Sequence, residues 1–331
     1  MKTQSTQAFG LFLIVIQGML CASASPPGAS RVAAWGDLRY DLTIAPSLPA
    51  TTPVAGISVG SFHSLVLRGD GTLVAWGDDR FGQTSIPDEA ERGQVVGVAA
   101  GNVHNLALLR NGTVIAWGPS GGEPGDYGQC DVPAGLDGVA AVAAGAVHSL
   151  ALRRDGTVVA WGSDVFGQCD VPPELDHVAA IAGGMCHSLA LREDGTVVAW
   201  GGNRMGQADV PEGLNHVVAI AAGGYHSLAL KDDGTVVCWG GYGLIRGSVP
   251  AGLANVVAIA TGDYHSLALQ RDGTLIAWGL NTAGQCDVPR GLRNVAAIAA
   301  RGSHSMVLVD EPPLPPKAGI APAAPSGNGE E

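Results

Sequence analysis

A unit of about forty residues repeats along this chain, and the repeat constrains the fold more than any other feature of the sequence. Each complete unit contains a histidine that is followed thirteen residues later by a tryptophan. The histidines are His63, His104, His148, His187, His226, His265 and His304. The tryptophans are Trp35, Trp76, Trp117, Trp161, Trp200, Trp239 and Trp278. A fixed period of this length is typical of architectures in which each unit packs against its neighbours.

One clean unit shows what the repeat encodes. Its runs at residues 217–223, 226–230 and 235–240 have the length and residue types of β-strands. Asp233-Gly234 separates the second run from the third, and Asp-Gly is a preferred two-residue hairpin turn. A shorter piece that ends at Pro250 completes the unit. We therefore predict a four-stranded antiparallel meander for each unit.

The two ends of the repeat region are complementary fragments. Residues 31–36 match the third strand of a unit with no first or second strand before them. Residues 295–300 and 304–309 match a first and a second strand with no third strand after them. The fragments add up to one unit, and pairing them would hide two sheet edges. The sequence thus predicts an all-β, seven-bladed β-propeller with four antiparallel strands per blade, whose last blade is shared between the N- and C-terminal strands.

Both flanks of the predicted propeller, residues 31–310, differ from the repeats. Residues 1–24 carry Lys2, an apolar run at 9–16 and a small-x-small site at residues 22–24, which indicate a cleaved secretory signal. A lipoprotein signal that uses Cys21 is the alternative. We expect a short linker at 25–30, a disordered Pro/Ala/Gly-rich tail at 311–331, no membrane span and a secreted protein, extracellular or periplasmic.

Charge and cysteine content exclude several partner classes. The formal net charge is −12, whereas binding to a phosphate backbone needs clustered lysine and arginine, so no nucleic acid is expected. Five cysteines follow the predicted signal, and three of them occupy the same slot in different repeats. Such slots lie in separate blades, so we expect small buried thiols and no disulfide framework.

No residue pattern in the chain predicts catalysis. One histidine per blade is spread around a ring, whereas metal ligands must converge on one ion. Each histidine is therefore expected to be structural, with its imidazole tying down the backbone of its own blade. Residues 56–60 match the Gly-x-Ser-x-Gly pattern of esterases, but they align with a first strand, and Ser58 takes an alanine slot. We therefore expect no catalytic site, no metal site, no cofactor and no enzymatic activity.

The aromatic residues other than tryptophan are distributed unevenly. Eight of them follow the predicted signal, and all fall in loops that share one face of the propeller: Tyr40, Phe62, Phe81, Tyr127, Phe166, Tyr225, Tyr242 and Tyr264. Exposed aromatic clusters mark interaction sites, so these are the candidate partner-binding residues. The alternative is that the five in loops after a tryptophan pack downward as anchors. The same face carries an insertion at residues 119–126.

The pattern His-Ser-Leu-Ala-Leu-x-x-Asp-Gly-Thr-Val-x-Ala-Trp-Gly, followed by Gly-Gln, resembles the repeats of the regulator-of-chromosome-condensation family over residues 31–309. The loop at residues 82–90 is similar to those of its secreted bacterial branch, which includes the propeller-type β-lactamase inhibitory protein. The resemblance implies the propeller fold, and the branch implies binding through aromatic loop residues. The founder's nucleotide-exchange activity is not expected, because the chain has no inserted wedge and no basic tail.

Together these features predict a secreted protein-binding module, a monomer whose aromatic loops contact a protein partner. An inhibitor of an extracellular enzyme is one form of this function. A cell-envelope scaffold is the alternative, and an enzyme, a lectin or a nucleotide-exchange factor is less favoured.

Overall fold

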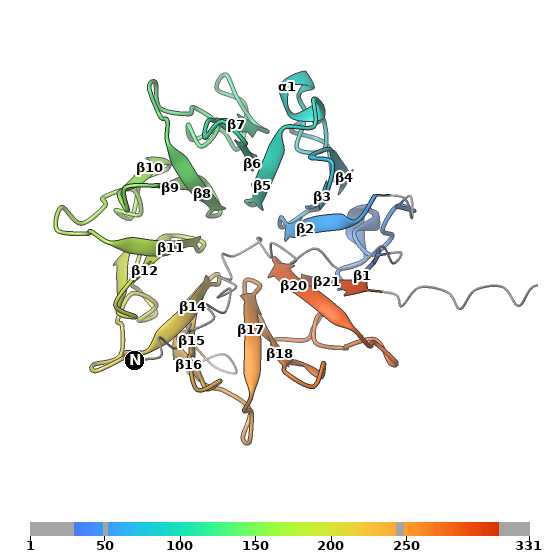
Figure 1. Ribbon diagram of the computed structural model, residues 1–331, viewed down its shortest axis with the longest axis vertical. Helices are drawn as coiled ribbons and strands as arrows, with labels where there is room; N and C mark the ends of the chain where they lie inside the picture. The colour runs from blue at the N-terminus through green and yellow to red at the C-terminus, as the bar shows by residue number, and fades with distance from the viewer. Residues whose placement is uncertain (1–29, 49–51, 243–247, 311–331) are drawn as a thin grey trace, which may run out of the picture.

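The computed structural model describes residues 30–48, 52–242 and 248–310, so the predicted signal peptide and tail lie outside the described residues. This part forms seven three-stranded antiparallel sheets, arranged around a common axis (Figure 1). In chain order, sheets one to six are β2–β3–β4, β5–β6–β7, β8–β9–β10, β11–β12–β13, β14–β15–β16 and β17–β18–β19, and sheet seven is β20–β21–β1.

Each sheet has an inner strand beside the axis, a middle strand and an outer strand (Figure 1). The inner strands are β2 (Val54–Val59), β5 (Val95–Ala100), β8 (Val139–Ala144), β11 (Val178–Gly183), β14 (Val217–Ala222), β17 (Val256–Thr261) and β20 (Val295–Arg301). The middle strands are β3 (His63–Arg68), β6 (Asn105–Leu109), β9 (His148–Arg153), β12 (His187–Arg192), β15 (His226–Lys231), β18 (His265–Gln270) and β21 (His304–Asp310). The outer strands are β4 (Leu73–Gly77), β7 (Val114–Trp117), β10 (Val158–Gly162), β13 (Val197–Gly201), β16 (Val236–Gly240), β19 (Leu275–Gly279) and β1 (Ser30–Gly36).

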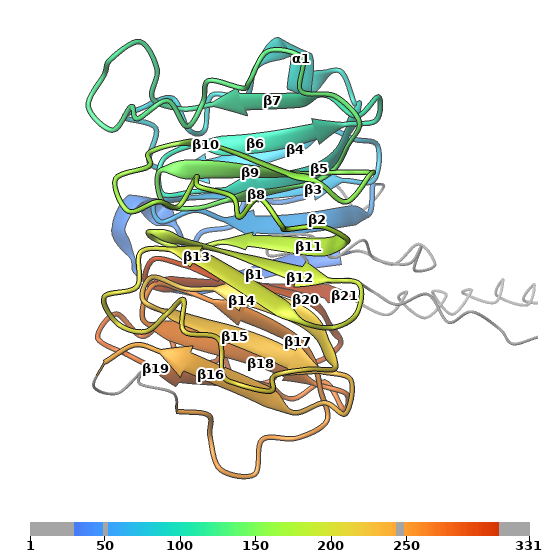
Figure 2. The ribbon, with the colours of Figure 1, turned by 90° about the vertical axis from the view of Figure 1, so that its left-hand side faces the viewer.

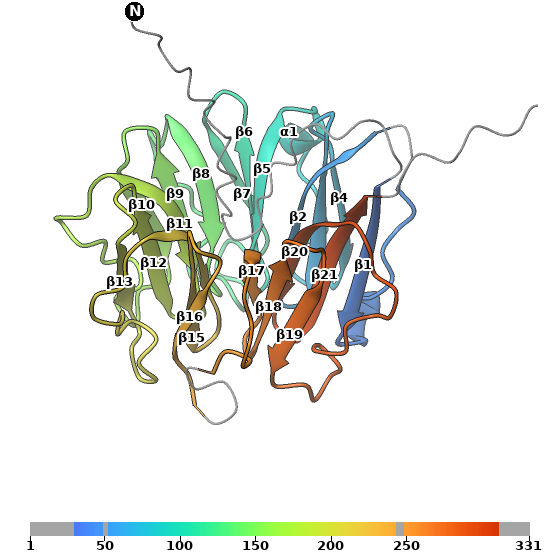
Figure 3. The same ribbon diagram turned by 60° about the horizontal axis from the view of Figure 1, so that its bottom comes forward.

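The predicted pairing of the two terminal fragments is confirmed. Strand β1 pairs antiparallel with β21, with Val32 opposite Leu308 and Trp35 opposite Ser305 (Figure 3). Strand β20 lies beside β2, so the last sheet and the first sheet are neighbours. The outer strand of sheet seven therefore comes from the opposite end of the chain to its inner and middle strands.

The predicted fourth strand of each unit is wrong for the described residues. The segments after the outer strands form loops that are closed by their own backbone bonds, as where Asp209 N donates to Gly206 O at 3.2 Å and Val210 N to Ala208 O at 3.0 Å. Each segment ends in a proline such as Pro211, which has no N–H to donate to a strand ladder. These segments therefore close on themselves and add no strand to a sheet.

The hydrophobic core lies between neighbouring sheets. Leu189 of β12, Ile220 of β14 and Trp239 of β16 belong to one buried cluster that joins sheets four and five. The indole Nε1 of Trp239 donates to Gln207 O at 2.9 Å, which fixes the loop of the preceding sheet. The tryptophans thus connect adjacent sheets through both packing and a hydrogen bond.

The seven marker histidines are buried and link successive sheets through their side chains. His187 Nε2 lies 3.0 Å from Ser227 Oγ of the next sheet, and Ser227 Oγ donates to Gln207 O at 2.8 Å. The last histidine returns to the first sheet, with His304 Nε2 3.3 Å from Ser64 Oγ. Each imidazole was expected to tie down the backbone of its own blade, and the structure instead shows a belt of side-chain bonds between sheets. We call these histidines and their Ser or Asn partners the histidine belt.

Burial keeps the histidine belt neutral. It lowers the pKa of His148 to about 3 and that of His226 to about 4, because water is excluded from the imidazolium form. Since Ser227 Oγ donates onward to a carbonyl, His187 Nε2 must carry the proton and donate to Ser227. The belt is therefore a directional network of uncharged groups.

Candidate binding face

Two kinds of loop share one face of the molecule, which we call the loop face. One kind joins each inner strand to its middle strand, and the other follows the Trp-Gly end of each outer strand. Gly77 pairs with His63, and Asp78 N donates to Phe62 O at 2.8 Å, so the two loops of a sheet lie side by side. The hairpin turns between middle and outer strands lie at the opposite side, which we call the turn face (Figure 2).

Three tyrosines from sheets five and six form a tyrosine cluster on the loop face. Tyr225 and Tyr264 stack with 5.5 Å between ring centroids and 27° between ring planes. Tyr242 meets both rings edge to face, at 6.2 Å from Tyr225 and 6.4 Å from Tyr264. Tyr242 is 51% exposed, and the other two are half-buried. The three rings therefore hold one another in place while one of them projects to solvent.

The rings of sheets seven and one form a second group with two arginines, the arginine–aromatic cluster. Tyr40 and Phe62 meet edge to face at 5.9 Å. The Arg80 guanidinium lies 5.0 Å from the Tyr40 ring centroid and 5.9 Å from that of Phe81, and Arg39 lies 5.7 Å from that of Phe62. Cations over aromatic faces are attracted by the ring quadrupole. The order along the cluster is thus Arg39, Phe62, Tyr40, Arg80 and Phe81.

An aspartate orients each arginine of this cluster. Arg80 Nε donates to Asp78 Oδ1 at 2.9 Å and Nη2 donates to Asp78 Oδ2 at 2.9 Å, and Arg39 binds Asp37 through the same two nitrogens. Hydrogen bonds from Arg39 hold the pKa of Asp37 below its ordinary value. Arg80 Nη2 also donates to the Tyr40 hydroxyl at 2.9 Å. Both guanidinium groups nonetheless stay largely exposed to solvent.

Sequence reasoning missed these two arginines, although a signal was present. The spacing Trp-Gly-Asp-x-Arg-aromatic occurs at residues 35–40 and again at residues 76–81. The two loops belong to sheets seven and one, which become neighbours only when the terminal fragments pair. Because the pattern occurs in both loops, a comparison of the two loops would have identified both arginines.

The remaining two candidates stand apart from both clusters. Tyr127 is 56% exposed and Phe166 is 46% exposed. Their backbone N–H groups donate to the side-chain oxygens of Gln129 and Gln168, at 2.6 Å and 2.9 Å. The eight candidate residues therefore form two clusters and two single rings, and none of the five in loops after a tryptophan is buried.

The insertion at residues 119–126 lies in the loop after β7, which projects from the loop face (Figure 2). The Asp126 carboxylate accepts from Gly122 N at 2.8 Å and from Gly128 N at 2.9 Å. These bonds lower the pKa of Asp126. The loop is thus tied by one acidic side chain at its base.

The other groups considered for chemistry occupy structural positions. Ser58 is buried, and its Oγ accepts from Ala100 N of the next sheet at 3.0 Å. Burial raises the pKa of the half-buried Cys286 thiol to about 11, so the thiolate is disfavoured at neutral pH. Within residues 30–48, 52–242 and 248–310, no three His, Cys, Asp or Glu side chains gather as a metal site would require.

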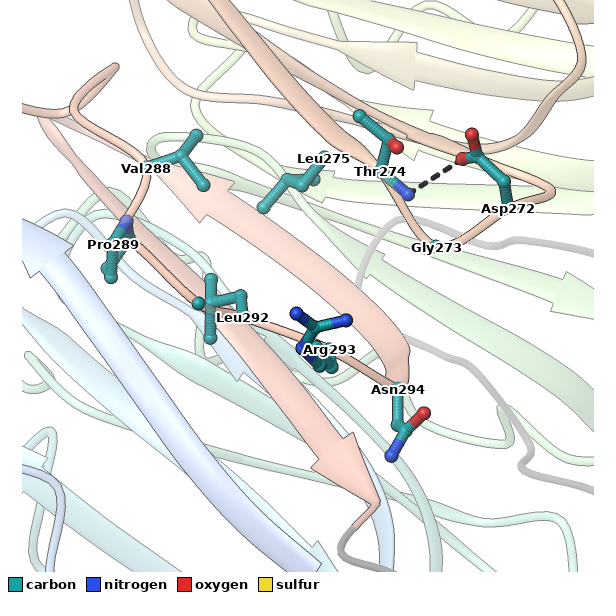
Figure 4. Close-up of a pocket in the computed structure, with 10 residues that line it drawn as sticks. Asp272, Gly273, Thr274, Leu275, Val288, Pro289, Leu292, Arg293 and Asn294 are labelled. Carbon is teal, nitrogen blue, oxygen red and sulfur yellow. Dashed lines mark hydrogen bonds between the residues drawn. The ribbon is translucent and has the colours of Figure 1, made fainter.

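A hollow of about 540 Å³ lies on the turn face, between the β18–β19 turn and the segment that leads to β20 (Figure 4). Leu275, Val288 and Leu292 line its apolar part. Its one carboxylate, Asp272, accepts from Thr274 N at 2.9 Å, and Arg293 is its one cation. The hollow lies away from all eight candidate residues.

No helix in the described part of the chain is both long and apolar enough to cross a membrane.

Repeated antiparallel sheets around one axis, joined by a hydrogen-bonded belt, define a β-propeller built from sequence repeats. The chain belongs to the Regulator of chromosome condensation (RCC1) repeat family, because the family model matches more than half of it. The matched residues are 54–83, 95–129, 139–168, 178–207, 217–241 and 256–285. The matches leave out the unit that is split between β1 and β20–β21.

Solved structures show the same fold. Prp20p from Saccharomyces cerevisiae is 20% identical, with a TM-score of 0.73 over 89% of this chain and 94% of that one. Yeast RCC1 (Prp20) bound to Kap60 is 20% identical, with a TM-score of 0.68 over 94% and 95%. Human WBSCR16 is 21% identical, with a TM-score of 0.67 over 85% and 99%. A comparison with curated proteins found no match.

Proposed function

We propose that this chain is a secreted protein-binding module and that its loop face contacts the partner. The exposed rings of that face carry the proposal: Tyr40, Tyr127, Phe166 and Tyr242 are each more than a third exposed. Large rings cost free energy in water and lose little conformational entropy when a partner covers them. A face that presents several such rings is suited to binding a protein surface.

The order of the rings supports this proposal. Tyr225, Tyr242 and Tyr264 are fixed by mutual contacts, and Arg80 is fixed by Asp78 and Tyr40. Groups that are already held in one geometry need not be immobilised at binding, which raises affinity. Rings buried between sheets would have favoured a cell-envelope scaffold.

The ring of sheets and the solved structures that resemble it also support a binding role. We take the seven sheets to be the seven blades of one rigid ring, with loops in place of a fourth strand. The Prp20p structure is described together with binding to Gsp1p and histones, and yeast RCC1 was solved bound to Kap60. Prp20, a protein with this fold, therefore binds other proteins. The specific binding function that we propose to test first is inhibition of an extracellular enzyme.

A capture experiment tests the proposal. The purified chain serves as bait for secreted proteins of its source organism, in parallel with a Tyr225→Ala/Tyr264→Ala variant and a turn-face variant, Asp233→Asn. We expect a partner that binds the wild type and the turn-face variant and is lost from the tyrosine variant. A partner that stays bound to the folded tyrosine variant would contradict this use of the face. Fractionation of expressing cells tests secretion separately.

A further inference from the structure

A backbone hydrogen bond joins consecutive sheets at the turn face. The first residue of an inner strand donates its N–H to the carbonyl of the hairpin-turn glycine in the preceding sheet, and we call this bond the turn clasp. It occurs at all five junctions from sheet one to sheet six, with N–O distances of 3.0–3.3 Å: Val95 to Gly71, Val139 to Gly112, Val178 to Gly156, Val217 to Gly195 and Val256 to Gly234. Among the described residues, no turn clasp joins Val295 of sheet seven to Gly273 of sheet six.

Sheets six and seven stand apart at this point. A Cβ at Gly234 would lie 3.1 Å from the Cα of Asn255 in the next sheet, whereas a Cβ at Gly273 would meet no atom beyond its chain neighbours within 4 Å. Val295 is half-buried, although the residues that begin the other six inner strands are all buried. The hollow of about 540 Å³ lies in this gap (Figure 4). The missing turn clasp therefore leaves an opening with an apolar lining between the two sheets.

The turn aspartate of sheet six also differs from its equivalents. In four other turns, hydrogen bonds from the turn threonine and then a nearby cation lower the pKa of the aspartate; the cations are Arg68, Arg153, Arg192 and Lys231. In sheet six, Gln270 takes the place of that cation, and hydrogen bonds from Thr274 lower the pKa of Asp272 without a contribution from a cation. Within the described part of the chain, Asp272 is thus an exposed carboxylate that forms no ion pair, although Arg293 lines the same hollow.

We propose that residues 311–317 of this chain, which directly follow β21, bind in this hollow. Strand β21 ends at the turn face, where Asp310 N donates to Asn294 O at 3.0 Å, and Asn294 lines the hollow. The segment reads Glu-Pro-Pro-Leu-Pro-Pro-Lys and lies outside the described residues. The proposal concerns the turn face and does not depend on the proposed function of the loop face.

The length and sequence of the segment suit the apolar part of the hollow. Its four prolines favour the extended polyproline II conformation, so little conformational entropy is lost at binding. At about 3.1 Å per residue, the four steps from Asp310 to Leu314 span about 12 Å. Leu292 lies two residues, or at most about 7 Å, from Asn294. The Leu314 side chain therefore reaches the apolar lining, where its burial is favourable.

The charges suit the same arrangement. Lys317, the one cation of the segment, faces Asp272, which has no paired cation among the described residues. Glu311 faces Arg293, which directly precedes Asn294 in the chain. Opposite charges thus meet on both sides of the apolar contact.

Other undescribed parts of the chain match the hollow less well. Residues 25–29 and 49–51 have neither a charge nor a large apolar side chain. Residues 243–247 contain a cation, but they follow Tyr242 of the loop face, on the opposite side of the ring. The segment after β21 is therefore the occupant that the hollow favours.

Methyl NMR of the full chain tests the proposal. Leucine methyl groups are labelled with ¹³C, and the wild type is compared with Leu314→Asp, which places a carboxylate at the proposed apolar contact without changing the described fold. We expect the signals of Leu275 and Leu292 to shift in this variant, whereas Leu253, the equivalent of Leu292 at the junction of sheets five and six, keeps its signal. Ile320→Asp, the same kind of change beyond the segment, should leave all of these signals unchanged.

A separate peptide of residues 311–317, acetylated and amidated, is then added to the Leu314→Asp chain. We expect the Leu275 and Leu292 signals to return toward their wild-type positions in a saturable way. A short tether gives an effective concentration of about millimolar, so a Kd of about 1 mM or tighter is enough to occupy the hollow at least half of the time in the intact chain.

Asp272→Asn measures the contribution of charge. The amide keeps an oxygen that accepts from Thr274 N, and the peptide should bind about twofold to fivefold more weakly. Asp233→Asn, the same change in sheet five, should leave peptide binding unchanged. Identical leucine signals in the wild type and in Leu314→Asp, or no saturable binding of the peptide, would overturn the proposal. Shifts that appear only as the protein concentration rises would also overturn it, because they would place a segment from a second copy in the hollow.

Discussion

The histidine belt and the aromatic clusters of the loop face differ in repetition, burial and charge. The belt has the same histidine in each sheet, is buried and is uncharged. The clusters use rings in some sheets only, are partly exposed and include charged arginines. The repeated feature holds the ring of sheets together, and the irregular features distinguish this chain from a generic propeller.

The belt also explains a glycine that precedes most of the marker histidines by three residues. A Cβ at Gly60 would lie 2.2 Å from Cε1 of His63, so a side chain there would collide with the imidazole. The seventh sheet has Arg301 at this position. Its Nη1 donates to Ala144 O at 3.0 Å and to Gly183 O at 3.3 Å, so one arginine connects sheet seven to sheets three and four across the axis.

Acidification should lower the free energy of unfolding more than any substitution described below, because it acts on every histidine of the belt. Folded pKa values of about 3 to 4 lie below the ordinary value of 6.5, so below pH 6.5 the unfolded chain takes up protons that the folded chain does not. The stabilisation is complete above pH 6.5 and is lost as the pH falls toward 4. Below pH 6.5, each histidine lowers the free energy of unfolding by about 1.4 kcal/mol per pH unit. Seven together should unfold the chain between about pH 6 and pH 5. Unfolding followed by circular dichroism against pH checks this, and an unchanged melting temperature at pH 5 would contradict it.

Removal of one hydrogen bond from the belt should lower the free energy of unfolding less than acidification does, but still substantially. Ser227→Ala leaves the buried His187 Nε2–H without its acceptor, and the free energy of unfolding should fall by about 1–3 kcal/mol. Asn105→Ser is the matched control. Asn105 now joins His63 Nε2 at 2.6 Å to Gln83 O at 2.8 Å, and a serine makes the same connection in other sheets. Urea denaturation should show the larger loss for Ser227→Ala, and partner affinity should be unchanged in both variants.

Truncation of one ring in the tyrosine cluster should have the opposite outcome, with a fall in partner affinity and little change in stability. Tyr225 contacts both other rings of the tyrosine cluster, so Tyr225→Ala removes one ring and releases the other two. A hot-spot ring typically contributes about 2 kcal/mol, so affinity for a captured partner should fall roughly thirtyfold. Calorimetric titration measures this, and thermal unfolding should change little. Loss of stability without loss of affinity would show that the cluster is structural.

The sequence predicted what repeats and missed what depends on packing between sheets. The inner, middle and outer strands and the shared sheet follow from a period that each unit restates. The fourth strand was wrong because strand-like residues such as Val210 are followed by a proline. The division of the rings into clusters, and the roles of Arg39 and Arg80, depend on which side chains meet across neighbouring sheets. The contacts of Arg301 join residues 118 and 157 positions apart, and no spacing in the sequence indicates them.

The smallest effects on stability and affinity are expected for substitutions on the turn face, where an equivalent turn of the same chain serves as a comparison. Asp233 Oδ1 accepts from Thr235 N and from Thr235 Oγ1 in the β15–β16 turn. The equivalent turn of sheet two has Asn111, whose Oδ1 accepts from Thr113 N at 3.0 Å and from Thr113 Oγ1 at 2.8 Å. An amide oxygen therefore already replaces the carboxylate in this turn, and Asp233→Asn should change neither stability nor affinity by a measurable amount. Asp233→Ala removes both bonds and should lower the melting temperature slightly while affinity stays the same. A drop in affinity for either variant, measured beside Tyr225→Ala, would place the partner on the turn face and remove the contrast between the two sides of the ring.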